Sequence, residues 1–304
     1  MSGASARIDL QAIMLGVLAA FFSGTHSVIV RYLADEVHGT TIAVLRLYCA
    51  AIMIFVLLRA KGQPLPANWF SPWLLLTVLG FSANYVVFHQ GLEYTGASSA
   101  MVLENTAPVF VLILTVLILR ERIRLIEVVA ALIALIGVIF TVRSDIELGG
   151  ESLLGDELEL LAGLTWAVFL MGSARLVVGS ENTFERLAVL FVVLGLSAVL
   201  LTPFLFLYPL TMSWEAFAWI LILGIFPTTI AYYLWYETAA RVSGFTTSLL
   251  FTLTVIFTFV NARIFLDEPF TIDMAIGTFL IIASVLLSKW PKRPEQRAPS
   301  SEGA

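Results

Sequence analysis

The sequence predicts an all-α integral membrane protein whose ten transmembrane helices form two inverted five-helix repeats. Three observations predict this fold. Ten long apolar runs fill most of the 304 residues, and a helix needs about 20 such residues to cross the ~30 Å hydrocarbon core. The two halves arrange their runs in the same order. The chain is 59% hydrophobic and 13% charged, with a mean hydropathy of +0.94, whereas soluble domains are about 25% charged.

Each predicted span is an apolar run that ends at glycine, proline or charged residues. Gly62 and Pro64 follow the second span, Arg120 the fourth, and Gly149 and Gly150 the fifth. We expect spans at residues 11 to 33, 41 to 59, 72 to 92, 99 to 119, 123 to 142, 156 to 177, 187 to 207, 215 to 239, 245 to 266 and 271 to 290. The first repeat then covers residues 1 to 145, the second 146 to 290, and a disordered cytoplasmic tail 291 to 304.

Basic residues indicate the orientation of the chain in the membrane. When the connections are assigned alternately to two sides, the side of the N-terminus collects 13 of the 17 basic residues. These are Arg7, Arg59, Lys61, Arg120, Arg122, Arg124, Arg175, Arg186, Arg241, Lys289, Lys292, Arg293 and Arg297. Because positive loops stay in the cytoplasm, we expect both termini there, in a multi-pass protein of the cell membrane, such as a bacterial inner membrane.

Five spans in each half make the second half cross the membrane in the opposite direction. The second half enters the membrane from the opposite side, so equivalent helices run antiparallel, as in transporters built from inverted repeats. Residues 21 to 33 align with 165 to 177 at a shift of 144, and residues 110 to 121 with 257 to 268 at a shift of 147. Identities are few, and the shared order of spans carries more of this prediction than they do.

Several motifs recur in the two halves. The first half has Leu-Glu-Tyr-Thr-Gly-Ala-Ser at 92 to 98 and Leu-Arg-Glu-Arg at 119 to 122; the second has Ala-Ala-Arg-Val-Ser-Gly at 239 to 244 and Leu-Asp-Glu-Pro at 266 to 269. With the aromatic residues Phe22 and Trp166 and the pair Arg46-Leu47, these motifs make residues 11 to 290 resemble the drug/metabolite transporter superfamily, specifically its EamA-type ten-helix members.

The resemblance implies export, or less often import, of small metabolites such as amino acids, through a cavity lined by helices one, three, four, six, eight and nine. The chain departs from the family pattern where Arg120 and Asp267 replace the common glycine, and where Val255 stands opposite Pro108. These departures weaken the expectation that both halves work alike.

Polar residues inside the spans are the candidates for substrate binding, because a charge at mid-bilayer costs at least about 2.5–3.5 kcal/mol. Glu104 lies about five residues, or ~8 Å, from the external end of its span, and Asn105 follows it. It could bind a substrate amine or carry a proton. Alternatively, it could be a structural partner of Arg46, which lies about equally deep in the second span.

His26 and three other residues could line the same cavity. His26 shares a helix face with Phe22 and could move a proton, or could be a neutral, hydrogen-bonded histidine. Asn84 and Trp166 lie near mid-membrane and would offer a polar group and an aromatic wall to a small amphipathic ligand. They could equally connect and pack helices. Tyr232 lies in an aromatic run that is more typical of a membrane interface.

The sequence favours a secondary transporter of an amino acid or a related zwitterionic or cationic compound, exported by alternating access. Importers of a vitamin or nucleoside-like compound and non-transport membrane proteins are the alternatives. The sequence lacks an HExxH motif, a G-x-S-x-G elbow and a Walker A motif, so we expect neither an enzyme nor an ATP-driven pump. We expect no cofactor, metal or nucleic acid. The expected partners are the lipid bilayer, a small molecule and, if transport is coupled, protons, with the protein a monomer or homodimer.

Overall fold

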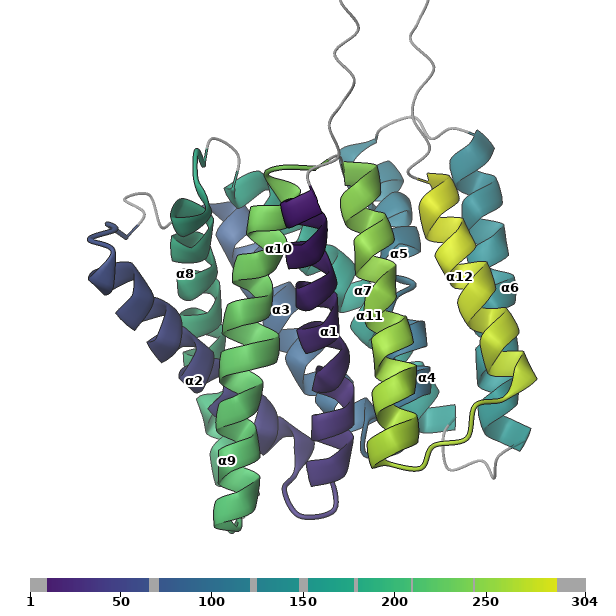
Figure 1. Cartoon of the computed structure of the whole chain (residues 1–304), viewed down its shortest axis with the longest axis horizontal. Coiled ribbons are helices and arrows are strands. Elements are labelled where there is room, and N and C mark those ends of the chain that lie inside the picture. Colours follow the sequence, from purple (N-terminus) through teal and green to yellow (C-terminus); the bar gives the residue numbers. More distant parts are fainter. Residues whose placement is uncertain are drawn as a thin grey trace, which may run out of the picture.

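The computed structural model describes residues 10–65, 71–120, 125–147, 153–177, 180–208, 210–242 and 244–288. Within these ranges every regular element is helical (Figure 1). The all-α class is therefore confirmed. The expected tail, residues 291 to 304, lies outside the described residues.

Helix occupies each stretch in which a span was expected, within the part of the chain that is described. The first half contains α1 (Leu10–Leu33), α2 (Gly39–Ala60), α3 (Pro72–Gly91), α4 (Ala97–Glu104), α5 (Ala107–Leu114), the π-helix η1 (Thr115–Leu119) and α6 (Leu125–Glu147). The second contains α7 (Leu153–Leu176), α8 (Thr183–Leu201), the 3₁₀-helix η2 (Thr202–Phe206), α9 (Trp214–Leu223), the π-helix η3 (Gly224–Ile230), α10 (Ala231–Ala239), α11 (Gly244–Phe265) and α12 (Ile272–Ser288).

Six helical stretches of the described chain are long and apolar enough to cross a membrane. They are Leu10–Leu33, Gly39–Ala60, Pro72–Gly91, Ala97–Ile118, Thr183–Phe206 and Trp214–Ala239. Shorter apolar helices cover Leu125–Thr141, Leu253–Phe265 and Ile272–Leu287. The surface of α6 is typical of contact with lipid, since Leu125, Leu132, Leu135 and Ile139 are all exposed on it.

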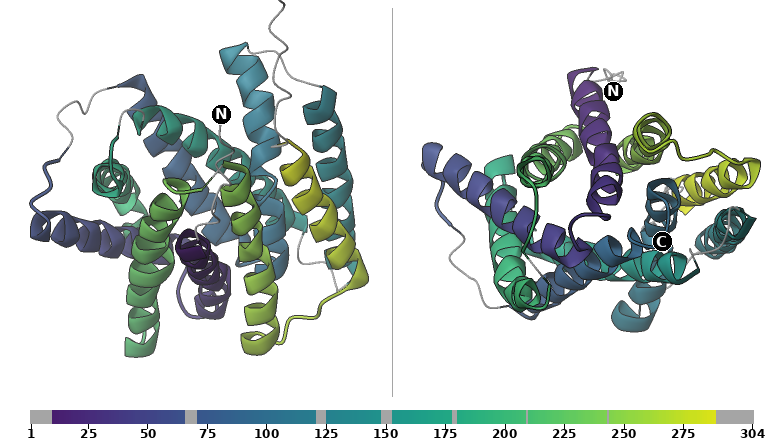
Figure 2. Two further views of the ribbon diagram at one scale, coloured as in Figure 1. Left: turned by 45° about the horizontal axis from the view of Figure 1, so that its top comes forward. Right: turned by 90° about the horizontal axis from the view of Figure 1, so that it is seen from below.

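The helices form one bundle with a peripheral pair at each edge. Helices α6 and α12 pack along each other at one edge, and α2 packs against α8 at the other (Figures 1 and 2). Between them, α3 runs along α7, and α1 runs along α11. The N-terminal end of α1 and the C-terminal end of α12 lie at the same end of the bundle, which is the upper end in Figure 1. We call the opposite end, with the α1–α2 and α11–α12 connections, the lower end.

Two residues that depart from the family pattern have left-handed backbone. Arg120 has φ 55° and Asp267 has φ 53°. Glycine is the residue that adopts positive φ without a steric cost, so the glycine that the resemblance leads us to expect at these two positions suits this backbone. Arg120 follows η1 and Asp267 follows α11, at positions that the sequence analysis aligned.

Candidate functional site

Glu104 is held by a neighbouring helix through Asn84. The Asn84 Nδ2 group donates to Glu104 Oε1 at 3.0 Å and to the Ala162 carbonyl, also at 3.0 Å. One side chain of α3 therefore connects the end of α4 to α7. Asn84 is buried and Glu104 is partly exposed. The direct hydrogen-bond partner of Glu104 is Asn84, a pairing that the sequence analysis did not anticipate.

Pro108 explains why the helix stops at Glu104. A proline lacks the N–H that would bond to the carbonyl four residues earlier, and its ring clashes with that carbonyl. Four residues before Pro108 is Glu104, and α4 ends there, with a turn at Asn105 and Thr106 before α5 begins. Gly163 of α7 packs against this turn, since an added Cβ would lie 3.2 Å from the Glu104 carbonyl oxygen. The carboxylate thus sits at a helix break inside an apolar segment.

Arg46 lies beside a second discontinuity. Pro227 falls within the π-helix η3, and the carbonyl of Leu223, four residues before it, accepts a hydrogen bond from the Thr228 hydroxyl at 2.8 Å. Thr228 Oγ1 in turn accepts from Arg46 Nε at 2.7 Å. The guanidinium also lies 5.2 Å from the centre of the Tyr85 ring. Because Pro227 has no N–H to bond to the Leu223 carbonyl, that carbonyl can accept from the Thr228 hydroxyl, which in turn accepts from Arg46.

The alternative that Glu104 is a structural ion-pair partner of Arg46 is not what the structure shows. Ion pairs among the described side chains join His38 to Glu93, Arg143 to Asp273, Arg241 to Glu237 and Arg263 to Asp267. Arg46 and Glu104 are within electrostatic range of each other but form no ion pair. Arg46 donates to Thr228 instead, and Glu104 accepts from Asn84.

His26 lies against a second histidine that the sequence analysis did not single out. Its ring stacks on Phe88 at 4.9 Å and lies 5.4 Å from the ring of His89. His89 bonds through Nδ1 to the Tyr85 carbonyl at 2.7 Å. Both Nε2 atoms are buried without a hydrogen-bond partner. The two rings form an aromatic and polar wall between α1 and α3.

The remaining candidates divide into two groups. Trp166 packs on Phe81 and Phe169, with ring centres 6.2 Å and 4.6 Å away. Tyr232 borders the same apolar cluster and lies within electrostatic range of Arg46 and Glu104. Both side chains border this apolar cluster, and Tyr232 also lies near the two charged residues.

The ring contacts of Phe22 and the side-chain hydrogen bonds of Asn105 within the described residues do not include Glu104, Asn84 or Arg46. Phe22 packs on Phe226 at 5.5 Å. Asn105 donates to the Met101 carbonyl of its own helix at 2.7 Å, so its side chain stabilises the end of α4. The structure does not bring these two residues into contact with the Glu104–Asn84 pair.

Glu159 is a buried carboxylate that the sequence analysis missed. It is 0% exposed on α7, and neither of its carboxylate oxygens has a hydrogen-bond partner. Its side chain packs against Gly91 at the end of α3, where an added Cβ would collide with the Glu159 carboxylate. Glu104 is within electrostatic range. Its place in the second turn of a predicted span is typical of a solvated interface residue, and only helix packing reveals its burial.

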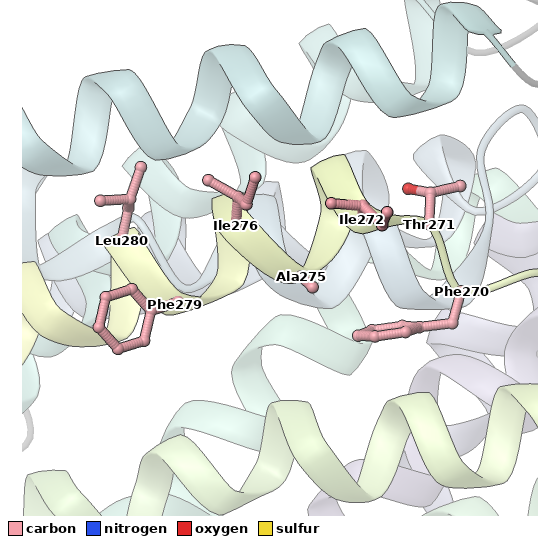
Figure 3. A pocket seen from close by; sticks show the side chains of 7 residues that line it. All are labelled: Phe270, Thr271, Ile272, Ala275, Ile276, Phe279 and Leu280. Atoms are coloured by element: carbon pink, nitrogen blue, oxygen red, sulfur yellow. The ribbon is translucent and has the colours of Figure 1, made fainter.

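An open groove elsewhere on the molecule is apolar. It has a volume of about 340 Å³ and follows α12, lined by Phe270, Thr271, Ile272, Ala275, Ile276, Phe279 and Leu280. Figure 3 shows Phe279 and Phe270 on one side of α12 and Ile276 and Leu280 on the other. Thr271 is its one polar residue. A groove of this composition suits lipid chains better than a polar substrate.

Comparison of the sequence with known proteins identifies the family of this chain. The EamA-like transporter family model matches residues 10–143 and again residues 153–290. The chain belongs to the EamA-like transporter family. The resemblance noted in the motifs is thereby confirmed, and the protein is a membrane transporter of the EamA type rather than an enzyme by family.

Relatives of this EamA protein bear transporter names as well. An uncharacterized transporter of Archaeoglobus fulgidus is 28% identical over 238 residues, covering 75% of this chain and 79% of the relative. The uncharacterized transporter YetK of Bacillus subtilis is 26% identical over 273 residues, covering 85% and 80%. The uncharacterized inner membrane transporter YhbE of Escherichia coli is 26% identical over 132 residues, covering 42% and 41%.

A solved structure supports the fold alone. A protein crystal structure with 17% sequence identity superposes with a TM-score of 0.62, covering 92% of this EamA chain and 97% of that one.

Proposed function

We propose that this EamA protein is a secondary transporter that exports a small amphipathic metabolite, an amino acid or a related zwitterionic or cationic compound, by alternating access. The substrate site is centred on Glu104 and Asn84, with His26, Trp166 and Tyr232 around it. The observation that carries this proposal is a carboxylate at a helix break inside an apolar segment. Broken helices at membrane depth mark substrate sites in transporters, and intramembrane carboxylates are by default functional.

The proposal assigns ten crossings to two inverted repeats, which is the architecture that alternating access uses. Matching carboxylates support the repeat. Glu93 Oε1 accepts from the Gly39 N–H at 2.6 Å, at the start of α2. Glu237 Oε1 accepts from the Thr183 hydroxyl at 2.5 Å, at the start of α8. Each residue of the second pair lies 144 positions after its counterpart.

The orientation is part of the same proposal. Both ends of the described chain lie at the upper end of the bundle, as an even number of crossings requires. The bias of basic residues assigns that end to the cytoplasm. The lower end, nearer to Glu104, then faces the outside.

Counterflow in proteoliposomes tests the function. Vesicles loaded with each of a panel of amino acids and small metabolites should take up the labelled compound when the protein is present. The Glu104→Gln variant should express and remain monodisperse but lose at least about tenfold in initial rate, because the neutral amide loses a charge-assisted contact with the substrate amine.

The matched control is Glu157→Gln, which changes an exposed glutamate of α7 and should transport like the wild type. Normal counterflow by Glu104→Gln would refute the site. Counterflow of phosphorylated compounds without any amino acid would refute the substrate class.

A further inference from the structure

The second charged group of the core has no assigned role in the site proposed above. We infer that Arg46 binds the carboxylate of the substrate, while Glu104 binds its amino group, so that the transporter selects zwitterions over amines. This inference rests on the proposed function and narrows its substrate class.

Arg46 is a buried cation with unused donors. It is 3% exposed, its Nε atom bonds to Thr228, and its Nη1 atom is buried without a partner. Arginine stays charged in proteins and has five N–H donors in a planar fork. Buried charges are normally paired, because an isolated ion loses its hydration without compensation. An anion bound at the Nη1 atom of Arg46 would therefore pair this buried charge.

The described side chains do not supply that anion. Glu104, the carboxylate whose charge interacts with Arg46, accepts from Asn84 instead. The neighbours of the guanidinium are a threonine hydroxyl and the ring of Tyr85. An anion from outside the chain would complete the site, and a carboxylate matches the guanidinium fork in two parallel hydrogen bonds.

The two charges flank one short stretch of α3. Arg46 lies over Tyr85, and Glu104 bonds to the preceding residue, Asn84. Because Asn84 binds Glu104 and Thr228 binds Arg46, the opposite charges lie near each other without forming an ion pair. A zwitterion placed along this stretch would donate from its ammonium group to Glu104 and accept at its carboxylate from Arg46. An amine would leave the guanidinium unpaired.

Matched ligands test this inference without altering the protein. The amino acid with the largest wild-type counterflow is compared with its carboxamide and with its decarboxylated amine, each as a competitor. We expect both analogues to compete at least about tenfold more weakly, which corresponds to the loss of a charge-assisted hydrogen bond. Equal competition by all three would overturn the role of Arg46 and leave the proposed function standing. Absence of amino-acid counterflow would overturn the proposed function itself.

Variants then locate the selectivity. Arg46→Gln should reduce the preference for the acid over the amide to about one, and Arg46→Lys should retain part of it, because lysine keeps the charge but not the fork. Arg59→Gln, an exposed position on the same helix, should keep the wild-type preference. An Arg46→Gln protein that folds and retains full preference would contradict the inference. If that variant fails to fold, Arg46→Lys and the wild-type competition series decide.

Discussion

Glu159 is buried from solvent, and none of the described residues donates a hydrogen bond to its carboxylate. The side chain is fully enclosed on α7, neither oxygen is hydrogen-bonded, and Glu104 adds a second carboxylate nearby. An enclosed carboxylate without a donor is among the most costly groups that a protein core can contain. Its presence next to the proposed site therefore invites a direct test of what it contributes to stability.

We predict that Glu159→Gln does not destabilise the protein. Glutamine has the same shape, so it fits against Gly91, and it replaces a carboxyl group whose oxygens have no hydrogen-bond partner with a neutral amide. The apparent melting temperature in detergent should remain equal to that of the wild type or rise.

Glu159→Ala is the contrasting variant, because it leaves a cavity between α3 and α7 and should cost about 2 kcal/mol. A large loss of stability in Glu159→Gln would mean that the carboxylate has a binding partner in the folded protein.

The sequence alone predicted part of this residue-level picture. Glu104 and Asn84 were recognisable, because polar residues in the middle of an apolar run stand out. Their hydrogen bond was not predictable, since it depends on how α3 faces α4. Glu159 was missed because its depth follows from the close approach of Gly91, and His89 because it lies near the end of its span. The burial of Glu159 and His89 depends on how neighbouring helices pack, and a hydropathy profile gives no information about that packing.

At several helix starts, the backbone N–H groups donate to a carboxylate. Glu268, in the α11–α12 connection, accepts from the backbone N–H groups of Ala97 at 2.7 Å and Ser98 at 3.1 Å, at the start of α4. The first N–H groups of a helix have no partner within the helix, and the helix dipole favours a negative charge there. The second half of the chain thus caps the broken helix that carries Glu104.

We predict that Glu268→Gln lowers the free energy of unfolding by about 1 kcal/mol, because a neutral amide retains one acceptor and loses the charge. Thermal unfolding in detergent measures the effect. Asp267→Asn is the control, since Asp267 is largely exposed and asparagine tolerates its positive φ. If the two variants have the same melting temperature, the Glu268 carboxylate does not stabilise α4.

At the level of elements the sequence predicted more than it did at the level of residues. Apolar runs bounded by charges gave helix ends close to the observed ones, such as residues 72 to 92 for α3. The interruption after Glu104 was not resolved, because the run from 99 to 119 is continuously apolar and Pro108 could mark either a bend or a break. The uninterrupted α11 has Val255 at the corresponding position, which keeps its backbone donor.

Three glutamates make polar contacts between the two halves at the lower end of the molecule. Glu36, after α1, accepts from the backbone N–H and the hydroxyl of Ser213 at the start of α9. Tyr32 donates to Glu215 at 3.1 Å, and Glu268 caps α4. These contacts join the two halves at the lower end of the bundle.

The last prediction concerns the equilibrium between conformations of the whole molecule. Under the alternating access proposed above, opening of the lower end would break the contacts of Glu36 and Glu268, and replacing both residues by glutamine should weaken them. A loss of about 1 kcal/mol at each changes the ratio of closed to open molecules by about 30-fold, since 1.36 kcal/mol corresponds to a factor of ten. Because both contacts join opposite halves, the change should widen the lower end rather than unfold a single helix.

Distances between two spin labels measure that change. The labels replace Tyr94 and Trp214, exposed residues of the two halves near this end. Cys49, the one cysteine of the chain, is first changed to serine so that only the introduced cysteines carry labels. The double variant should add a population with a longer distance between the labels, and substrate should alter its share. Glu181→Gln, an exposed change at the upper end, should leave the distribution unchanged. A double variant that only melts earlier, with wild-type distances, would show that these carboxylates stabilise their own helices and do not control opening. Since the carboxylates join opposite repeats, we expect the longer distance.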